Sequence, residues 1–209
     1  MAGRTKVREM YLIAALGNPG REYELTRHNA GFMTADAFCG IHGFSCDKER
    51  FYSLCGETRV GAEKVLLIKP QTYMNLSGIA VRAAADYYRI DPEHIIVIHD
   101  DIEFPMGELR IRRGGGPGTH NGMKSVVSSL ATTKFPRIRF GVGDNGSRDL
   151  RDYVLSPFTS EELEIMKSSA EKAAQAIDCY ISEGIDSAMN KFNPRRIKKA
   201  PVEGENKDN

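Results

Sequence analysis

The sequence predicts one α/β domain built on a twisted, mixed and mostly parallel sheet that is flanked by helices. Residues 10–16 and 95–99 are short apolar runs, the second strongly β-branched, and both end at polar residues. Such runs are typical of strands that are buried on both faces. Segments with helical periodicity separate the predicted strands, and this alternation favours a parallel α/β sheet.

The other elements follow from local patterns. Residues 51–60 and 65–69 flank the turn at 61–63 and predict a hairpin, while 108–113 and 138–142 predict two more strands. Helices are predicted over 31–41, 77–89 and 123–130. Residues 159–162 read Thr-Ser-Glu-Glu, a capping box that opens a further helix with one apolar face.

The bulk properties limit the class of protein. A chain of 209 residues, 41% of them hydrophobic, can bury one core. We place this domain at 10–192, between an N-terminal extension over 1–9 and a disordered tail over 193–209. No apolar run approaches the roughly 20 residues of a membrane span, and four cysteines without a Cys-x-x-Cys pair favour free thiols. We therefore expect a cytoplasmic protein with no membrane partner.

One stretch of the chain is strongly basic, although the net charge is only +1. Residues 109–143 include seven basic residues and no Asp or Glu. They could form a phosphate-binding face, or a solvated surface whose charges are balanced by neighbours in space. The glycine-rich loop inside the stretch favours a polyanionic partner. The seven are Arg110, Arg112, Arg113, Lys124, Lys134, Arg137 and Arg139.

Two residues that follow predicted strands form a candidate catalytic pair. His28 comes soon after the Gly-Asn-Pro-Gly turn at 17–20, and Asp100 follows the strand at 95–99. Functional crevices of α/β sheets lie at the carboxyl ends of the strands, so we expect the two to converge. An imidazole oriented by a carboxylate is suited to act as a general base, here towards water. The alternatives are a structural loop histidine and an aspartate that caps the strand end.

Three asparagines beside glycine-containing turns are candidates for substrate contacts. The amides of Asn18, Asn75 and Asn121 can hold a peptide backbone or an ester carbonyl without fixing its charge. Asparagine is also a common turn residue for purely structural reasons. The loop at 114–118 leads to a helix start that could bind an anion, or it is simply a mobile loop. His99, Asp100, Asp101 and His120 lack a recognised metal-ligand spacing, so we expect no metal.

Taken together, the motifs resemble the bacterial-type peptidyl-tRNA hydrolase family over about residues 10–190. They occur in the family's order, and no single one would suffice. The family's glycine loop usually has glycine where this chain has Thr119, and this change removes no catalytic group. The motifs are Gly17-Asn18-Pro19-Gly20, Tyr23, Thr26-Arg27-His28-Asn29-Ala30-Gly31, residues 70–78 (Pro-Gln-Thr-Tyr-Met-Asn-Leu-Ser-Gly), His99-Asp100, and Gly114-Gly115-Gly116 with His120-Asn121-Gly122.

The resemblance implies hydrolysis of the ester that joins a peptide to the 3′-terminal ribose of tRNA. By matching positions, His28 is the catalytic base and Asp100 its partner, and Asn18 helps to distinguish N-blocked from free aminoacyl groups. Substrate contacts are implied for Tyr23, Tyr73, Asn75 and Asn121, and tRNA contacts for Arg110, Arg112, Lys124 and Arg139. The resemblance also implies a monomer, and we expect no cofactor.

Two other functions remain open on the sequence. Some relatives of the family act in RNA splicing, so a non-catalytic RNA-binding protein on the same fold is one alternative; retention of His28, Asp100 and the asparagines argues against it. A nucleotide-dependent enzyme using the glycine loop is the other. The chain has no Gly-x-Gly-x-x-Gly or Walker A motif to support it.

Overall fold

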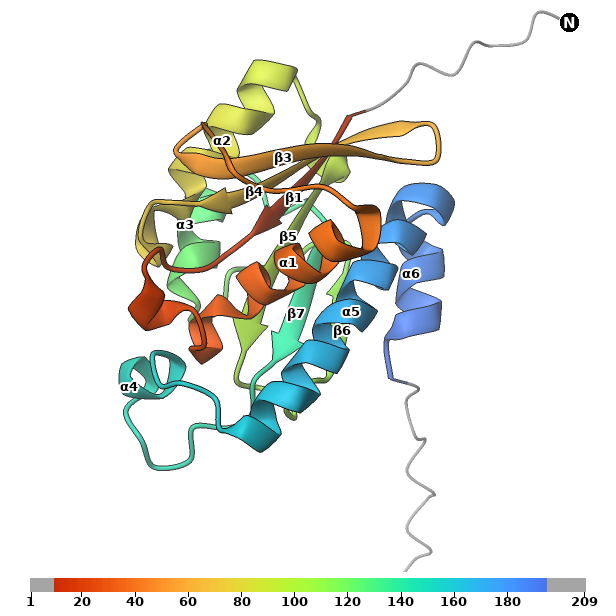
Figure 1. Cartoon of the computed structure of the whole chain (residues 1–209). Helices are drawn as coiled ribbons and strands as arrows, with labels where there is room; N and C mark the ends of the chain where they lie inside the picture. The colour runs from red at the N-terminus through yellow and green to blue at the C-terminus, as the bar shows by residue number, and fades with distance from the viewer. Residues whose placement is uncertain (1–9, 195–209) are drawn as a thin grey trace, which may run out of the picture.

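The computed structural model describes residues 10–194, so the expected extension over 1–9 and most of the expected tail lie outside the described residues. Seven strands form one sheet in the order β2-β3-β4-β1-β5-β7-β6 (Figure 1). The four central strands run parallel, and the others pair antiparallel with their neighbours. The strands are β1 (Met10–Ala15), β2 (Lys48–Arg50), β3 (Ser53–Val60), β4 (Glu63–Pro70), β5 (Ile95–Asp101), β6 (Leu109–Arg112) and β7 (Arg137–Gly141).

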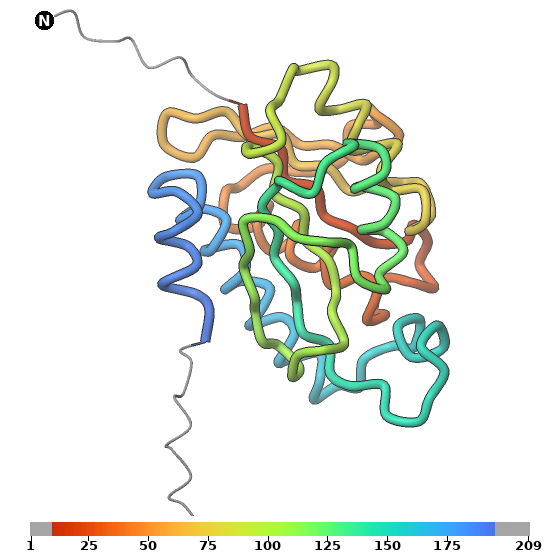
Figure 2. Tube along the Cα trace, turned by 180° about the vertical axis from the view of Figure 1, so that it is seen from behind, coloured from red at the N-terminus to blue at the C-terminus, as the bar shows by residue number. Residues whose placement is uncertain are grey.

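Helices cover both faces of the sheet. Figure 1 shows α1 (Ala30–His42), α5 (Ser160–Glu183) and α6 (Ile185–Phe192) on the near face. The reverse view in Figure 2 brings α3 (Asn121–Leu130) to the front, packed beside α2 (Ser77–Tyr88). A short helix, α4 (Leu150–Val154), lies away from the sheet. Among the described residues, no helix has both the length and the apolar character needed to cross a membrane.

The central strand β1 explains the two-sided core. Ile13 and Ala15 belong to the core under α1 and α5, whereas Leu12 and Ala14 belong to the core under α2 and α3. Side chains alternate between the faces of a strand, so a strand covered on both faces must be apolar throughout. The continuous apolar run over residues 10–16 therefore reflects the central position of β1 in the sheet.

The connections of β1 and β4 create a crevice at the carboxyl ends of the central strands. The chain leaves β1 through α1 on one face and leaves β4 through α2 on the opposite face. β1 lies between β4 and β5, so the two connections diverge at its carboxyl end. A ligand crevice is expected at such a switch point.

The predicted fold class is confirmed, and the predicted helices and strands occur with end shifts of a few residues. The hairpin needs one correction, because Phe51 and Tyr52 form a turn and β3 begins only at Ser53. Both turn residues have positive φ, 52° and 55°, a conformation that usually selects Gly or Asn. Because aromatic residues are common in strands, Phe51 and Tyr52 were predicted to belong to the strand. β2, α4 and α6 were not predicted. β2 and α4 are too short for a period to stand out, whereas α6 has a clear apolar period in Ile185, Ala188, Met189 and Phe192 that the sequence prediction missed.

A single glycine allows α1 to start against the sheet. A Cβ on Gly31 would clash with the carbonyl oxygen of Leu16 and lie 2.8 Å from that of Ile98. Both are backbone atoms of the central strands or their ends, so neither can move aside cheaply.

We predict that Gly31→Ala lowers the free energy of unfolding by about 3 kcal/mol, because the added methyl overpacks a backbone contact. Gly40→Ala in the same helix is the matched control, since its Cβ would meet nothing within 4 Å. It should be neutral or raise stability by up to about 1 kcal/mol through helix propensity. Urea denaturation measures both; equal effects would refute the close-approach explanation.

Candidate active site

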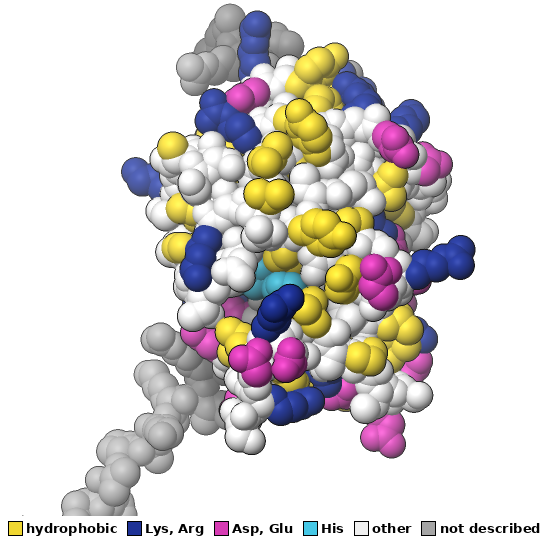
Figure 3. All heavy atoms as spheres, turned by 90° about the vertical axis from the view of Figure 1, so that its left-hand side faces the viewer, with side chains coloured by type: hydrophobic (Ala, Val, Ile, Leu, Met, Phe, Trp, Pro, Cys, Tyr) yellow, Lys and Arg dark blue, Asp and Glu magenta, His cyan; other side chains and the backbone are white. Residues whose placement is uncertain are grey.

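A pocket of about 1240 Å³ occupies the crevice at the carboxyl ends of β1 and β5. It is lined by the turn after β1, the start of α3, the glycine loop and α4. Figure 3 shows histidine atoms at the surface near the middle of one face, with hydrophobic side chains above them and charged side chains of both signs below. The pocket therefore lies at the carboxyl ends of the central strands, where the sheet topology predicts a ligand crevice.

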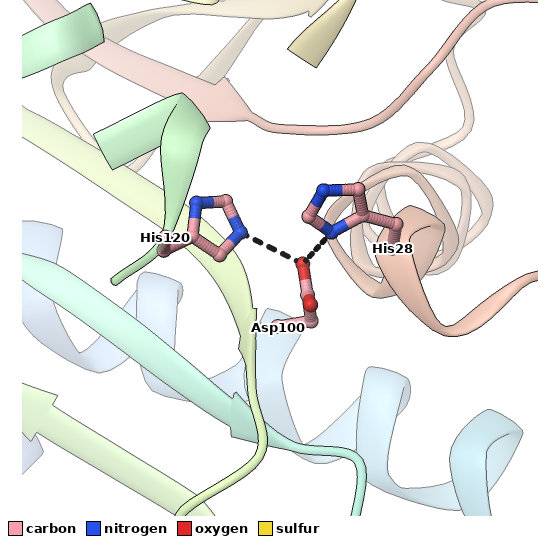
Figure 4. A group of neighbouring side chains, drawn as sticks. All are labelled: His28, Asp100 and His120. Atoms are coloured by element: carbon pink, nitrogen blue, oxygen red, sulfur yellow. Dashed lines mark hydrogen bonds and ion pairs between the residues drawn. The ribbon is translucent and has the colours of Figure 1, made fainter. Parts of the chain in front are cut away.

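Two imidazoles share one buried carboxylate in this pocket (Figure 4). Nδ1 of His28 lies 2.8 Å from Oδ1 of Asp100, and Nε2 of His120 lies 2.9 Å from the same oxygen. Asp100 is at the end of β5 and only 2% exposed. His28 lies in the 3₁₀ helix η2 (Arg27–Asn29), and His120 caps the start of α3. Three separate segments thus converge on one oxygen atom.

The charge of Asp100 fixes which ring nitrogens carry protons. Burial alone would raise the pKa of this carboxyl, but the two histidines outweigh burial and hold the pKa far below its ordinary value. An ionised carboxylate only accepts hydrogen bonds. His28 therefore donates from Nδ1 and His120 donates from Nε2. This agrees with Nδ1 of His120, which accepts a hydrogen bond from the Met123 N–H at 3.2 Å.

His28 keeps one nitrogen available for chemistry. With its proton on Nδ1, Nε2 carries a lone pair and has no hydrogen-bond partner among the residues that the structure describes. Burial would lower the pKa of this imidazole, but the charge and hydrogen bond of Asp100 overcome burial and raise the pKa above its ordinary 6.5. The result is a stronger base than a free histidine.

A third histidine, His99, is hydrogen-bonded to the backbone of Asp100. It is 4% exposed, and its Nδ1 lies 2.7 Å from the backbone carbonyl oxygen of Asp100. Burial is the main cause that holds its pKa well below 6.5. His99 therefore stays neutral and adds no positive charge next to Asp100.

Asn18 is held in a fixed orientation by three hydrogen bonds. Its N–H donates to Oδ1 of Asn29 at 2.8 Å, and its carbonyl oxygen accepts from Nδ2 of Asn29 at 3.0 Å. Its side-chain Oδ1 accepts from the Met74 N–H at 2.8 Å. The remaining Nδ2 group meets no acceptor in the described part of the chain, so two N–H donors are available to a ligand carbonyl.

The other predicted substrate residues all line the pocket. They are Tyr23, Tyr73, Asn75 and Asn121, and they come from η1 (Arg21–Tyr23), the segment after β4 and the start of α3. Tyr73 is 59% exposed and stands at the rim. The structure thus gathers both the implied catalytic residues and the implied substrate residues around one cavity.

The predicted tRNA-contacting residues divide into two groups. Arg112 and Arg139 line the pocket, whereas Arg110 and Lys124 lie outside its lining. Arg139 contacts the carboxylates of Asp101 at 2.5 Å and Glu103 at 2.6 Å. Arg112 and Lys124 are exposed, and neither forms an ion pair with a described residue.

Part of the basic stretch is therefore neutralised by carboxylates from elsewhere in the sequence. Arg110 pairs with Glu108 at 2.6 Å, and Arg113 pairs with Asp186. Arg137 is buried and donates to the carbonyl oxygens of Gly116 and Thr133, so it holds the glycine loop. The sequence count overstates the free positive charge of this surface.

One group of side chains has the composition of a metal site. The ligand atoms of His28, Asp100 and His120 lie within 4.8 Å of one another. Nδ1 of His28 and Nε2 of His120 are the nitrogens that donate to Asp100. A metal bound through these two nitrogens would displace both protons and end the orientation of His28, so coordination of that kind and the hydrogen-bond network exclude each other.

The fold and the site define a class: a single-domain α/β protein whose pocket presents a His–Asp pair suited to activate water. Among the described residues that line the pocket there is no serine or cysteine to serve as a nucleophile. The two N–H donors of the Asn18 Nδ2 group can also bind a carbonyl oxygen of a ligand.

Comparison with known proteins identifies the family. Residues 12–200 match the family model described as peptidyl-tRNA hydrolase. The peptidyl-tRNA hydrolase of Alkaliphilus metalliredigens is 50% identical over 184 residues, covering 88% of this chain and 100% of that protein. The one from Carboxydothermus hydrogenoformans is 47% identical, covering 88% and 98%. This chain therefore belongs to the peptidyl-tRNA hydrolase family.

Solved structures agree with the comparison of sequences. The Arg119Gln mutant of peptidyl-tRNA hydrolase from Acinetobacter baumannii superposes with a TM-score of 0.84 at 33% identity, covering 91% of this chain and 97% of that one. A second structure of the Acinetobacter baumannii protein gives a TM-score of 0.83 at 34% identity, over 88% and 94%. The sheet and helices described above are thus those of the family.

Sequence reasoning missed two residues of the site. His120 appeared only in a motif and as a rejected metal ligand, although it shares Asp100 with His28. Asn29 was not singled out, yet it holds the backbone of Asn18. The sequence signal that could have found them is their position just before the predicted helices over 31–41 and 123–130. Both helices begin near the sheet edge where the candidate site was expected.

We predict that Asp100→Asn lowers the pKa of His28 from above 6.5 to below it, because burial then acts without the opposing charge. Asp101→Asn is the control, since that carboxylate pairs with Arg139 instead. Titration of the imidazole ¹⁵N shifts by NMR measures both variants. An unchanged His28 titration in Asp100→Asn would contradict the proposed origin of the shift.

Proposed function

We propose that this chain hydrolyses the ester bond between tRNA and a peptide or an N-blocked aminoacyl group. The observation that carries the proposal is the 2.8 Å contact of His28 Nδ1 with Asp100 Oδ1, which leaves Nε2 free at a residue that lines the pocket. The family and the names of the relatives support the same substrate. The product tRNA is then free for reuse in translation.

The geometry supports a general-base mechanism. Nε2 of His28 takes a proton from a water molecule, and Asp100 stabilises the imidazolium that forms. The activated water attacks the ester carbonyl carbon. The Nδ2 group of Asn18 is a donor for the developing oxyanion or for the neighbouring peptide carbonyl. The tetrahedral intermediate then expels the 3′-oxygen of the tRNA, which receives the proton from His28.

The tRNA is proposed to lie against the basic side of the pocket, whose lining includes the exposed cation Arg112. Lys124 is proposed to contribute a further contact, and Arg110 and Arg139 weaker ones, since these two arginines already pair with carboxylates. Contacts of this kind bind phosphates without reading the base sequence. We further propose that the protein works as a monomer in the cytoplasm, where its tRNA substrate occurs.

We predict that His28→Ala lowers kcat by at least about 10³-fold, because the base is removed. Binding of tRNA should change less than twofold, since the basic surface is intact. His42→Gln is the control: this histidine pairs with Asp178 at the C-terminal end of α1, and the variant should keep full activity. The assay is release of N-acetyl-aminoacyl groups from tRNA, with unblocked aminoacyl-tRNA alongside.

The same assay separates the alternatives. Cleavage of the blocked substrate alone, lost in His28→Ala, supports the proposed reaction. Salt-sensitive binding of tRNA without any cleavage would instead favour a non-catalytic RNA-binding protein on this fold.

We predict that Arg112→Ala raises KM for the tRNA substrate and lowers the salt slope of tRNA binding by about one, because one phosphate contact is lost. Arg139→Ala should have a smaller effect, since Asp101 and Glu103 already neutralise that guanidinium. Arg82→Ala, which removes a cation paired with Asp86 on α2, is the control. Equal effects of the three substitutions on the salt slope would refute the proposal that Arg112 binds phosphate more strongly than the arginines that already pair with carboxylates.

A further inference from the structure

A buried arginine stands directly before the proposed catalytic base. Arg27 is 4% exposed and is the first residue of η2, the 3₁₀ helix that presents His28. Burying a guanidinium is costly unless its charge is paired and its donors are satisfied. The surroundings of Arg27 must therefore be arranged specifically to receive it.

One end of the guanidinium holds the loop before α5. Its Nη1 donates to the carbonyl oxygen of Ser156 at 3.2 Å, to the Ser156 hydroxyl at 2.9 Å and to the carbonyl oxygen of Pro157 at 2.8 Å. These acceptors lie about 130 residues away in the sequence. The contact therefore joins two remote segments of the chain.

The other end of the guanidinium pairs with helix α5. Its Nη2 lies 2.7 Å from both carboxylate oxygens of Glu162. The same carboxylate accepts the Thr159 N–H at 2.8 Å as half of a capping box, so it is already fixed at the start of the helix. The rings of Tyr153 and Phe158 contact the guanidinium, with centroids 4.6 and 5.1 Å from Cζ. The side chain of Arg27 is thus held at both of its terminal nitrogens, while its buried Nε has no hydrogen-bond partner among the described residues.

The backbone on either side of His28 is also fixed. The Arg27 N–H donates to the Ser156 carbonyl at 3.3 Å, and Thr26 forms a β-bridge with Pro157. On the other side, Asn29 is hydrogen-bonded to Asn18. His28 lies between these two attachments, so its approach to Asp100 depends on both.

We propose that Arg27 is a positioning residue for His28: its contacts with Glu162 and the 156–157 loop hold η2 so that the imidazole meets Asp100 and the pocket. This inference rests on the proposed role of His28 as the base. The same loop continues into Val154 and Leu155, which line the pocket wall. Arg27 therefore sets the base relative to the surface on which the substrate lies.

The chemistry of the contact requires arginine. Nη1 and Nη2 act on two different partners at once, whereas a lysine ammonium is a single point charge. Arg27→Lys keeps the charge and loses the planar arrangement. Small displacements of catalytic groups are expensive: an error of about 1 Å can cost on the order of 100-fold in rate. We expect kcat to fall at least about 10-fold in Arg27→Lys, with KM within twofold.

Glu162→Gln is a second, milder variant. It keeps one oxygen that can accept from Nη2 and from the Thr159 N–H, it replaces the other oxygen by an NH2 group, and it removes the charge. It should lower kcat in the same direction by a smaller factor. Because its shape is preserved, it tests the inference even if Arg27→Lys folds poorly.

The matched control breaks a different contact of α5, one that joins it to α1 and not to η2. His42 at the end of α1 pairs with Asp178 of α5, Nε2 to Oδ1, at 2.9 Å. Asp178→Asn therefore weakens the attachment of α5 to α1 without touching η2. Its kcat should stay within twofold of the wild-type value, even if its thermal stability falls.

The experiment measures kcat and KM on N-acetyl-aminoacyl-tRNA, thermal unfolding, and the ¹⁵N titration of His28 in each free protein. The inference predicts a loss of kcat and an altered His28 titration in Arg27→Lys and Glu162→Gln, but not in Asp178→Asn. A His28 titration identical to wild type, with kcat falling only as far as stability falls, would overturn it. A wild type that cleaves nothing refutes the proposed function instead, and the His28 titration still tests the positioning.

Discussion

The site depends on a single buried carboxylate that accepts two imidazoles on the same oxygen. Asp100 is almost inaccessible to water and remains ionised only because His28 and His120 surround it. Its charge then fixes both ring tautomers, raises the basicity of His28 and leaves Nε2 of that ring free. If this charge were lost, each of those properties would be lost with it.

The rest of the fold can be understood as the means of bringing three segments to that oxygen. The strand β5 delivers Asp100, and Gly31 lets α1 begin close against the ends of β1 and β5, which brings η2 within reach. Arg27 then ties η2 to α5, while His120 caps α3 from the opposite face. The helices of both faces thus meet at one point, and this is the crevice that the diverging connections of β1 and β4 create.

Local patterns in the sequence predicted what depends on local physics. The apolar runs of β1 and β5 and the capping box of α5 are fixed by neighbouring residues, and they appear as predicted. Functional crevices of α/β sheets lie at the carboxyl ends of the strands, and this rule predicted that His28 and Asp100 converge at one edge of the sheet. The pairing of Arg27 with Glu162 and of Arg139 with Asp101 and Glu103 depends on tertiary packing, so no local pattern contains it. For that reason the basic stretch looked more highly charged in the sequence than its surface is.

The most direct test of the account is the pH dependence of kcat/KM for an N-blocked aminoacyl-tRNA, because it reports the ionisation of the free enzyme. Only neutral His28 can accept a proton, so the rate should fall as pH drops through a single midpoint above 6.5. That midpoint should coincide with the NMR titration of His28. A rate that is flat across this range, or a midpoint that does not follow His28, would contradict the claim that Asp100 prepares His28 as the base.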